Sequence, residues 1–368
     1  MANQYGSNLN IEIYGGSHDK EIGVRLSGFP VGLRVDHEAL LTFMARRAPG
    51  NNALSTPRRE ADKPVFLSGL ADGVTDGSTI HAAIYNENVR SSDYSFVYDT
   101  PRPGHADFAA LQKYGSAVDL RGGGRFSGRL TAPLCIAGGM ALQYLAERGI
   151  FVGAHVASVA DVSDDRFGTD VSREALLALT AMPFPVLDPS KEAPMRERIL
   201  AARTDGDSVG GVVECAVTGL PAGLGEHMFD GVEGRIAALM FSVPAVKGVE
   251  FGAGFAAATM RGSENNDVFY TDGRTVRTKT NHCGGILGGM TNGMPVVFRA
   301  AFKPTPSIAK EQDTVSLSRM ENTKLKIGGR HDPCVVLRAV PVVEAVAALA
   351  VLDLLLDSDK HEDNSNEE

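Results

Sequence analysis

Arginine and glycine are concentrated in the segment RGGGRFSGRLTAP, residues 121–133. Glycine lets backbone N–H groups approach a ligand closely, and the planar guanidinium group of arginine pairs well with phosphate or carboxylate. The segment lacks the GK[ST] ending of a Walker loop and does not match a GxGxxG fingerprint after a strand. It therefore predicts either a tight turn or an anion cradle, in which the N–H groups at 122–124 open a helix beside Arg125 and Arg129.

Three groups suited to proton transfer lie in other segments rich in glycine or proline. His18 follows Gly-Gly-Ser at the end of a predicted strand, and His105 follows Pro-Gly where a helix is expected to open. Asp332 lies in GGRHDPC, residues 328–334, beside an arginine and a histidine. Each could also be an ordinary turn or cap residue. A Ser17–His18 nucleophile pair is not expected, because adjacent side chains in an extended chain point to opposite faces.

Further arginines lie in ARRAPGNNALSTPRREAD, residues 45–62. They are Arg46, Arg47, Arg58 and Arg59. This group suits an anionic ligand, although a solvated helix end would explain it as well. No metal site is expected, since the couples His282–Cys283 and His331–Cys334 lack the close spacing of common zinc sites. The four cysteines are far apart without a CxxC motif, which is typical of reduced thiols in a cytoplasmic protein.

Composition excludes several classes of protein. The 368-residue chain has a net charge of −9, to which the tail 357–368 contributes −5 (six acids and one lysine), so no basic field for nucleic acid exists. The most apolar run, near 339–356, carries Glu344 and Asp353, which favours a core helix over a membrane span. The N-terminus shows no basic and apolar leader pattern. We expect a cytoplasmic protein without membrane or nucleic-acid partners.

The elements that must position these residues alternate irregularly. Periodicity predicts strands at 10–16, 21–28, 78–89, 151–162, 210–221 and 295–304, with an Asp-Gly hairpin at 270–279. It predicts helices at 36–47, 105–115, 127–149, 172–181, 189–203, 229–240 and 335–356. Without a repeated strand–helix unit, this order favours an α+β fold over a doubly wound sheet. We expect one domain over 1–356 and a disordered acidic tail over 357–368.

The motifs in their order resemble those of the chorismate synthase family from about Gly15 to Leu356. The matching segments are GGSHD (15–19), RPGHAD (102–107), RGGGRFSGRLTA (121–132), PAGLGE (221–226), AVKGVEFG (245–252), NHCGGILGG (281–289), KPTPSI (303–308) and GRHDPC (329–334). One glycine-rich loop would mean little, but so many ordered motifs are highly specific.

The resemblance implies a reaction and a fold. Chorismate synthases convert 5-enolpyruvylshikimate 3-phosphate to chorismate by anti-1,4 elimination of phosphate, in the shikimate pathway of aromatic amino acid biosynthesis. They need reduced FMN without net redox change, and the flavin is thought to lend an electron and to accept the C6 proton at N5. The substrate carries a phosphate and two carboxylates, which accounts for arginines on an acidic protein. The implied fold is a β-α-β sandwich, with helices layered between two antiparallel sheets, in a homotetramer.

The resemblance also implies roles for individual residues. His18 and His105 would be the proton donors, one toward the reduced flavin and one toward the departing phosphate, and Asp332 would work with flavin N5 on the C6 proton. Arg47 and Arg129 would hold the substrate. The residues implied to hold FMN are Arg125, Phe126, Ser127, Ala245, Gly288, Lys303, Pro304, Thr305, Pro306, Ser307 and Arg330. NADPH would be needed only if the enzyme reduces its own flavin.

Several positions depart from the family pattern. They are Gly16 for Glu, Asp19 for Gly, Ala53 for Arg, Phe126 for Ser, Gly128 for Ala and Pro244 for Asn. The change at Ala53 removes one anion contact and weakens any expectation of NADPH binding. Two rival interpretations therefore stay open: an FMN- or NAD(P)H-dependent reductase, and a flavin-binding homologue with weakened catalysis. The presence of His18, His105 and Asp332 argues against the second.

Overall fold

The computed structural model describes residues 4–50, 54, 62–86, 96–328 and 331–365, with side chains up to Ser358. The predicted cofactor residue Arg330, the departure at Ala53 and the arginines Arg58 and Arg59 lie outside the described residues.

The first sheet has five antiparallel strands in the order β1-β2-β3-β7-β4. Their bounds are β1 Gln4–Tyr5, β2 Asn10–Gly15, β3 Glu21–Ser27, β4 Val65–Ser68 and β7 Ile80–Tyr85. In β3 the apolar residues alternate, so Ile22, Val24 and Leu26 are buried while Arg25 is exposed on the other face. The strand predicted at 78–89 is shorter than expected, because β7 ends at Tyr85.

The second sheet also has five antiparallel strands, in the order β11-β16-β10-β8-β9. Their bounds are β8 Phe151–Val159, β9 Val162–Ser163, β10 Gly211–Thr218, β11 Val246–Phe251 and β16 Val296–Phe302. Two helices, α4 (Arg173–Ala181) and α5 (Glu192–Thr204), contact this sheet at β8. Leu176 of α4 approaches Gly153 of β8 so closely that a Cβ there would lie 2.9 Å from the leucine Cβ.

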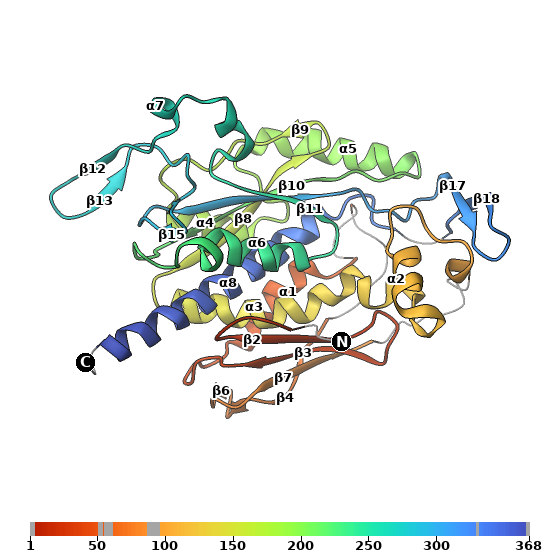
Figure 1. The fold of residues 1–368 in the computed structure, drawn as a ribbon, viewed down its shortest axis with the longest axis horizontal. Helices are drawn as coiled ribbons and strands as arrows, with labels where there is room; N and C mark the ends of the chain where they lie inside the picture. The colour runs from red at the N-terminus through yellow and green to blue at the C-terminus, as the bar shows by residue number, and fades with distance from the viewer. Residues whose placement is uncertain (1–3, 51–53, 55–61, 87–95, 329–330, 366–368) are drawn as a thin grey trace.

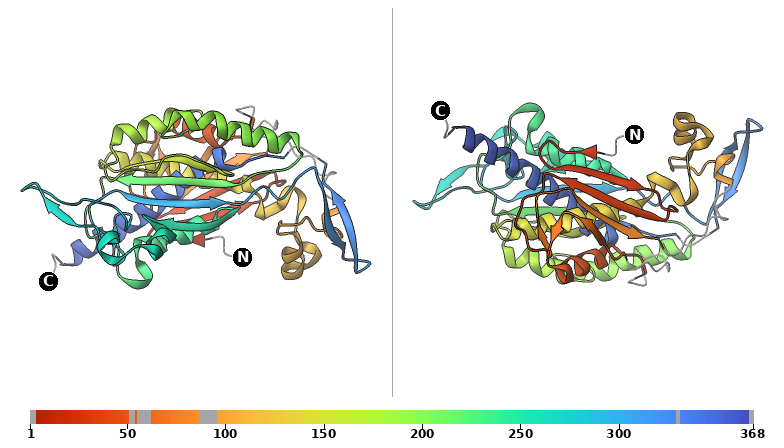
Figure 2. Two further views of the ribbon diagram at one scale, coloured as in Figure 1. Left: turned by 90° about the horizontal axis from the view of Figure 1, so that it is seen from above. Right: turned by 90° about the horizontal axis from the view of Figure 1, so that it is seen from below.

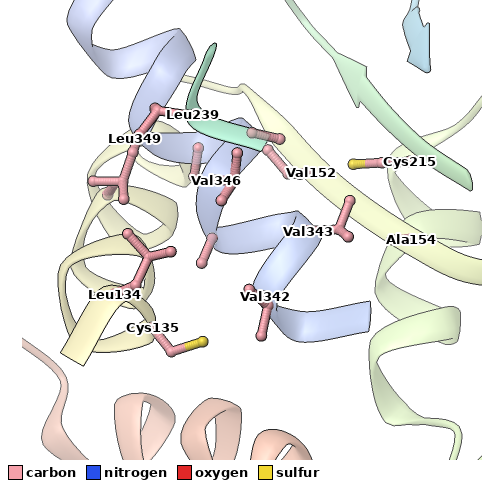
Figure 3. Close-up of a cluster of buried hydrophobic side chains, with 14 of the residues drawn as sticks. Leu134, Cys135, Val152, Ala154, Cys215, Leu239, Val342, Val343, Val346 and Leu349 are labelled. Carbon is pink, nitrogen blue, oxygen red and sulfur yellow. The ribbon is translucent and has the colours of Figure 1, made fainter. Parts of the chain in front are cut away.

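Three helices lie between the two sheets (Figure 1). They are α1 (His37–Arg47), α3 (Thr131–Ala146) and α8 (Val336–Ser365). Helix α3 contacts β3 and β7 of the first sheet and β8 of the second, and α8 contacts β8 and β10. The α3–α8 crossing needs a small residue, since a Cβ at Gly138 would lie 2.3 Å from the Cβ of Ala345. Figure 3 shows the apolar side chains that fill this layer, among them Leu134, Val343 and Val346.

Two helix boundaries correct the sequence prediction. Helix α3 begins at Thr131 and not at 127, with Pro133 in its first turn, where its missing N–H leaves no bond unmade. Helix α8 runs to Ser365, so the stretch 357–365 that was predicted to be disordered is helical. The part of α8 at Val336–Ser358 is long and apolar enough to cross a membrane, but 89% of its most apolar 18-residue window is buried inside the protein, which is typical of a core helix.

The remaining elements are short. They are β5 Leu70–Ala71, β6 Val74–Thr75, α2 Asp107–Tyr114, α6 Val232–Ser242, α7 Gly262–Asn265, β12 Phe269–Thr271, β13 Val276–Thr278, β14 Ile286–Leu287, β15 Met290–Thr291, β17 Glu311–Ser316 and β18 Glu321–Lys326. The predicted Asp-Gly hairpin is confirmed as β12–β13. Helix α2 and the β17–β18 hairpin lie at one end of the molecule and β12–β13 at the other (Figure 2). Helices and antiparallel sheets without a strand–helix repeat agree with the predicted α+β class.

Candidate active site

A cavity of about 620 Å³ gathers most of the sequence motifs. Small-molecule sites are usually about 300–1,000 Å³, so it is large enough for a cofactor or substrate. It is lined by the end of α1, the loop before α2, the arginine–glycine loop, the start of β11, the residues after β16 and the start of α8. The predicted site residues that line it are Arg47, His105, Arg125, Phe126, Ser127, Arg129, Ala245, Lys303, Thr305, Pro306, Ser307 and Asp332.

The arginine–glycine loop packs against both predicted catalytic histidines. Its glycines at 122–124 adopt left-handed backbone conformations with φ of 56°, 90° and 51°. A Cβ on Gly122 would lie 2.2 Å from Cε1 of His18, and one on Gly123 would lie 3.2 Å from Nε2 of His105. The loop does not open a long helix as predicted, since α3 begins only at Thr131. The glycines are therefore required by close packing as well as by backbone conformation.

His18 lies behind this loop. It is 8% exposed, is not one of the described residues that line the cavity, and contacts Gly122, which does line it. Its Nδ1 is 3.0 Å from Oγ of Ser17, which also donates to the carbonyl of Arg121 at 2.9 Å. The expectation that Ser17 and His18 point apart was wrong, because these residues form a turn and are not extended.

His105 is oriented by a buried carboxylate. Asp107 is fully buried, and its Oδ1 accepts hydrogen bonds from Nη2 of Arg102 and from Nδ1 of His105, both at 2.7 Å. Burial alone would raise the pKa of Asp107, but the hydrogen bonds from Arg102 and His105 outweigh it and hold that pKa well below its usual range. With a hydrogen on Nδ1, the other ring nitrogen of His105 is the one available for proton exchange in the cavity.

The two predicted substrate arginines share one carboxylate. Asp62 accepts hydrogen bonds from Arg47 and from Arg129. Arg47 also donates to Oγ1 of Thr131 at 3.0 Å, and Arg129 donates twice to Oδ1 of Asn86, at 3.0 and 3.2 Å. Arg47 is only 2% exposed, and burial lowers its pKa to about 10. Two guanidinium charges against one carboxylate leave one net positive charge for a ligand.

The cavity as a whole is electropositive. Its lining contains seven cationic side chains, namely Arg47, Arg102, Arg125, Arg129, Lys247, Lys303 and Arg338. Asp332 is the one acidic side chain among the described lining residues, and it is paired with Arg338. Burial and the neighbouring Lys247 lower the pKa of Lys303. On a chain with a net charge of −9, such a concentration of positive charge suits a multiply anionic ligand.

Other predicted residues lie elsewhere. Gly288 is in the turn between β14 and β15, at the end of the molecule opposite α2, and does not line the cavity (Figure 1). Pro304 is not among the lining residues either. Arg46 forms an ion pair with the buried Glu344 of α8, with Nη2 2.9 Å from Oε1. In the part of the chain that the structure describes, no three His, Cys, Asp or Glu side chains gather as metal ligands would.

Sequence reasoning also left out residues that line the cavity. Three of them, Arg102, Lys247 and His331, lie inside the family motifs quoted above. Their place in these motifs could therefore have predicted that they line the site. Arg338 lies outside the motifs. It bridges Asp332 and the carbonyl of Arg47, to which its Nε donates at 2.9 Å, and only the packing of α8 against α1 reveals this.

Fold and cavity together define an α+β enzyme-type site for a multiply anionic small molecule. The family model described as chorismate synthase matches residues 9–356. A chorismate synthase from Lancefieldella parvula is 45% identical over 96% of this chain and 96% of its own length, and one from Korarchaeum cryptofilum is 44% identical over 96% and 97%. A crystal structure of a chorismate synthase, 27% identical, matches with a TM-score of 0.74 over 96% of this chain and 93% of the other.

The chain belongs to the chorismate synthase family. This membership confirms the resemblance seen in the motifs, the predicted enzyme class of carbon–oxygen lyases acting on phosphates, and the predicted place in aromatic amino acid biosynthesis.

Proposed function

We propose that the cavity binds 5-enolpyruvylshikimate 3-phosphate and eliminates its phosphate to form chorismate. The observation that carries this proposal is the charge of the lining, whose seven cationic side chains exceed the three carboxylates paired with them, Asp62, Asp107 and Asp332. The substrate has one phosphate and two carboxylates, so its charge complements such a lining. Arg47 and Arg129, which share Asp62, are positioned to pair with these anionic groups.

We further propose reduced FMN as the cofactor, because the residues present fit it. Lys303, Arg125 and Lys247 can pair with its phosphate, and Oγ1 of Thr305 is a buried polar atom without a hydrogen-bond partner among the described residues. Phe126, which replaces the family's serine, lines the same cavity and packs against Tyr114 with ring centroids 6.5 Å apart. When bound, the reduced flavin would supply an electron and take up the C6 proton.

Side chains of the protein carry out the proton transfers. His105, held through Nδ1 by Asp107, gives a proton from Nε2, and His18, which packs against Gly122 behind the loop, is the second proton donor. Asp332 assists removal of the C6 proton. Both histidines pack on the same glycine loop, His18 at Gly122 and His105 at Gly123.

We also propose the detailed fold, the oligomeric state and the cellular location. We propose the family's β-α-β sandwich as the detailed fold, since α3 contacts strands of both sheets. A homotetramer is proposed because large apolar side chains stay exposed on the single chain, with Met228 at 76%, Phe229 at 88% and Phe255 at 86%. A cytoplasmic location is proposed because the four cysteines are free thiols. NADPH would take part only if the enzyme reduces its own flavin.

The decisive test supplies the proposed substrate anaerobically with FMN reduced by dithionite and follows phosphate and chorismate. We expect one phosphate per chorismate, no consumption of reduced FMN, and no turnover with oxidised FMN alone. A reductase would consume NAD(P)H in proportion to product. A homologue with weakened catalysis would bind FMN and substrate without forming chorismate, and either result would refute the proposal.

Replacement of Asp332 by asparagine tests the proposed proton transfer. We expect folding and substrate binding to persist while C–H cleavage slows, so a primary deuterium isotope effect with substrate labelled at C6 should increase. The control is Asp161→Asn, which also removes an aspartate paired with an arginine, Arg198, but does not line the cavity. An unchanged rate with an unchanged isotope effect would remove Asp332 from the mechanism.

A further inference from the structure

His331 lines the cavity but takes no part in the proton transfers proposed above. It is half-buried at the entrance to α8, next to Asp332. Its Nε2 is a buried polar atom that has no hydrogen-bond partner among the residues that the structure describes. A buried polar nitrogen without a partner is costly, so such an atom on a residue that lines a cavity points to a missing ligand group.

The other ring nitrogen determines what Nε2 can do. The imidazole of His331 donates a hydrogen bond to the backbone carbonyl of Gly328, and because Nε2 is unpartnered this donor is Nδ1. In the neutral ring the hydrogen is therefore on Nδ1, which leaves a lone pair on Nε2. Burial lowers the pKa of His331, and the nearby Arg102 lowers it further against the opposing effects of Gly328 and Asp332. The lowered pKa favours the neutral ring, in which Nε2 is an acceptor.

An acceptor at this place contrasts with the rest of the lining. The seven cationic side chains are donors that suit the anionic oxygens of a ligand. We propose that Nε2 of His331 accepts a hydrogen bond from an N–H or O–H group of the bound ligand, and so makes the cavity selective for ligands with a donor at that position. This proposal rests on the proposed function, in which two molecules could supply the donor: the ring N–H groups of the flavin, or the hydroxyl group of the substrate.

Binding measurements on His331→Phe and His331→Gln test the contact without relying on turnover. Phenylalanine keeps a planar ring but has no acceptor, while glutamine restores an acceptor oxygen. FMN affinity is measured by fluorescence titration, and substrate affinity by calorimetry with FMN present. We expect His331→Phe to weaken the binding of one of the two by about 10- to 100-fold, since a ligand donor loses its partner. His331→Gln should recover most of this loss, and the ligand that is affected identifies the donor.

The control is His282→Phe, because His282 is also half-buried but does not line the cavity. It should leave both affinities unchanged. If His331→Phe is folded by circular dichroism and binds FMN and substrate like the wild type, the proposal is wrong, although the wild-type chorismate assay would still support the function. Equal loss in the Phe and Gln variants would mean that His331 only shapes the loop, which also overturns the proposal. If the Phe variant does not fold, histidine nitrogen-15 NMR of the wild type decides: Nε2 must be the unprotonated nitrogen and must shift when the ligand binds.

Discussion

Replacing His105 with alanine is expected to lower kcat by about 10²–10⁴-fold, the usual contribution of one general acid. The imidazole lines the cavity and is held by the fully buried Asp107 at 2.7 Å, so its orientation does not depend on the ligand. FMN binding should change little, because the cationic side chains remain. The measurement is anaerobic turnover with reduced FMN, together with a fluorescence titration of FMN.

Adding imidazole to the His105→Ala variant tests whether the lost activity is due to lost proton transfer. The alanine variant leaves a space beside Gly123, and a small imidazole that occupies it should recover part of the turnover if proton transfer is what was lost. The control His37→Ala removes an exposed histidine at the start of α1 that does not line the cavity, and it should keep wild-type turnover. Near-normal kcat for His105→Ala across about pH 6–8 would show that this histidine is structural.

The second large effect concerns stability and involves residues that do not line the cavity, in a row of charges across the second sheet. His155, Glu214, Arg299 and Glu250 are direct cross-strand neighbours on β8, β10, β16 and β11. Nε2 of His155 is 3.0 Å from Glu214, and its Nδ1 is 2.9 Å from Asp164. His155→Leu is expected to lower the free energy of unfolding by about 3–5 kcal/mol, because it removes the histidine hydrogen bonds of two buried carboxylates and places an apolar side chain beside them.

The loss should depend on pH. Burial alone would lower the pKa of His155, but its hydrogen bonds to Asp164 and Glu214 outweigh this and raise it. A histidine whose pKa is higher in the folded state contributes stability that is fully present below its unfolded pKa of about 6.5, and that is lost as the pH rises through the folded-state pKa. In urea titrations, the difference between wild type and His155→Leu should therefore be larger at about pH 6 than at about pH 9.

An exposed histidine–carboxylate pair provides the matched control. His227 is 2.5 Å from Glu226, but its side chain is 71% exposed. His227→Leu should change the free energy of unfolding by less than about 1 kcal/mol, because solvent screens such pairs. If His155→Leu were as mild as this control, or if its effect grew with rising pH, the row of charges would not stabilise the sheet as described.

Local structural features and family membership could be predicted from the order of the residues alone. Alternating apolar residues predicted strands such as Ile22–Leu26 correctly because β-sheet periodicity is a local property. The Asp-Gly pair at 272–273 predicted its hairpin for the same reason, since Asp272 accepts from backbone N–H groups two and three residues ahead. The ordered motifs identified the family, and most of their predicted site residues line one cavity.

Which side chains meet, and what net charge each site carries, became clear only from the folded chain. Arg47 and Arg129 share Asp62, Arg338 joins Asp332, and Gly288 lies away from the cavity, although it was predicted beside the others. These outcomes depend on contacts between residues far apart in the chain, which the spacing of residues in the sequence does not encode. They also depend on burial, which strengthens the attraction between opposite charges but imposes a desolvation penalty on each charge. The glycine loop at 122–124 illustrates the difference. Its composition predicted an unusual backbone conformation, but only its packing against His18 and His105 explains why no side chain fits at Gly122 and Gly123.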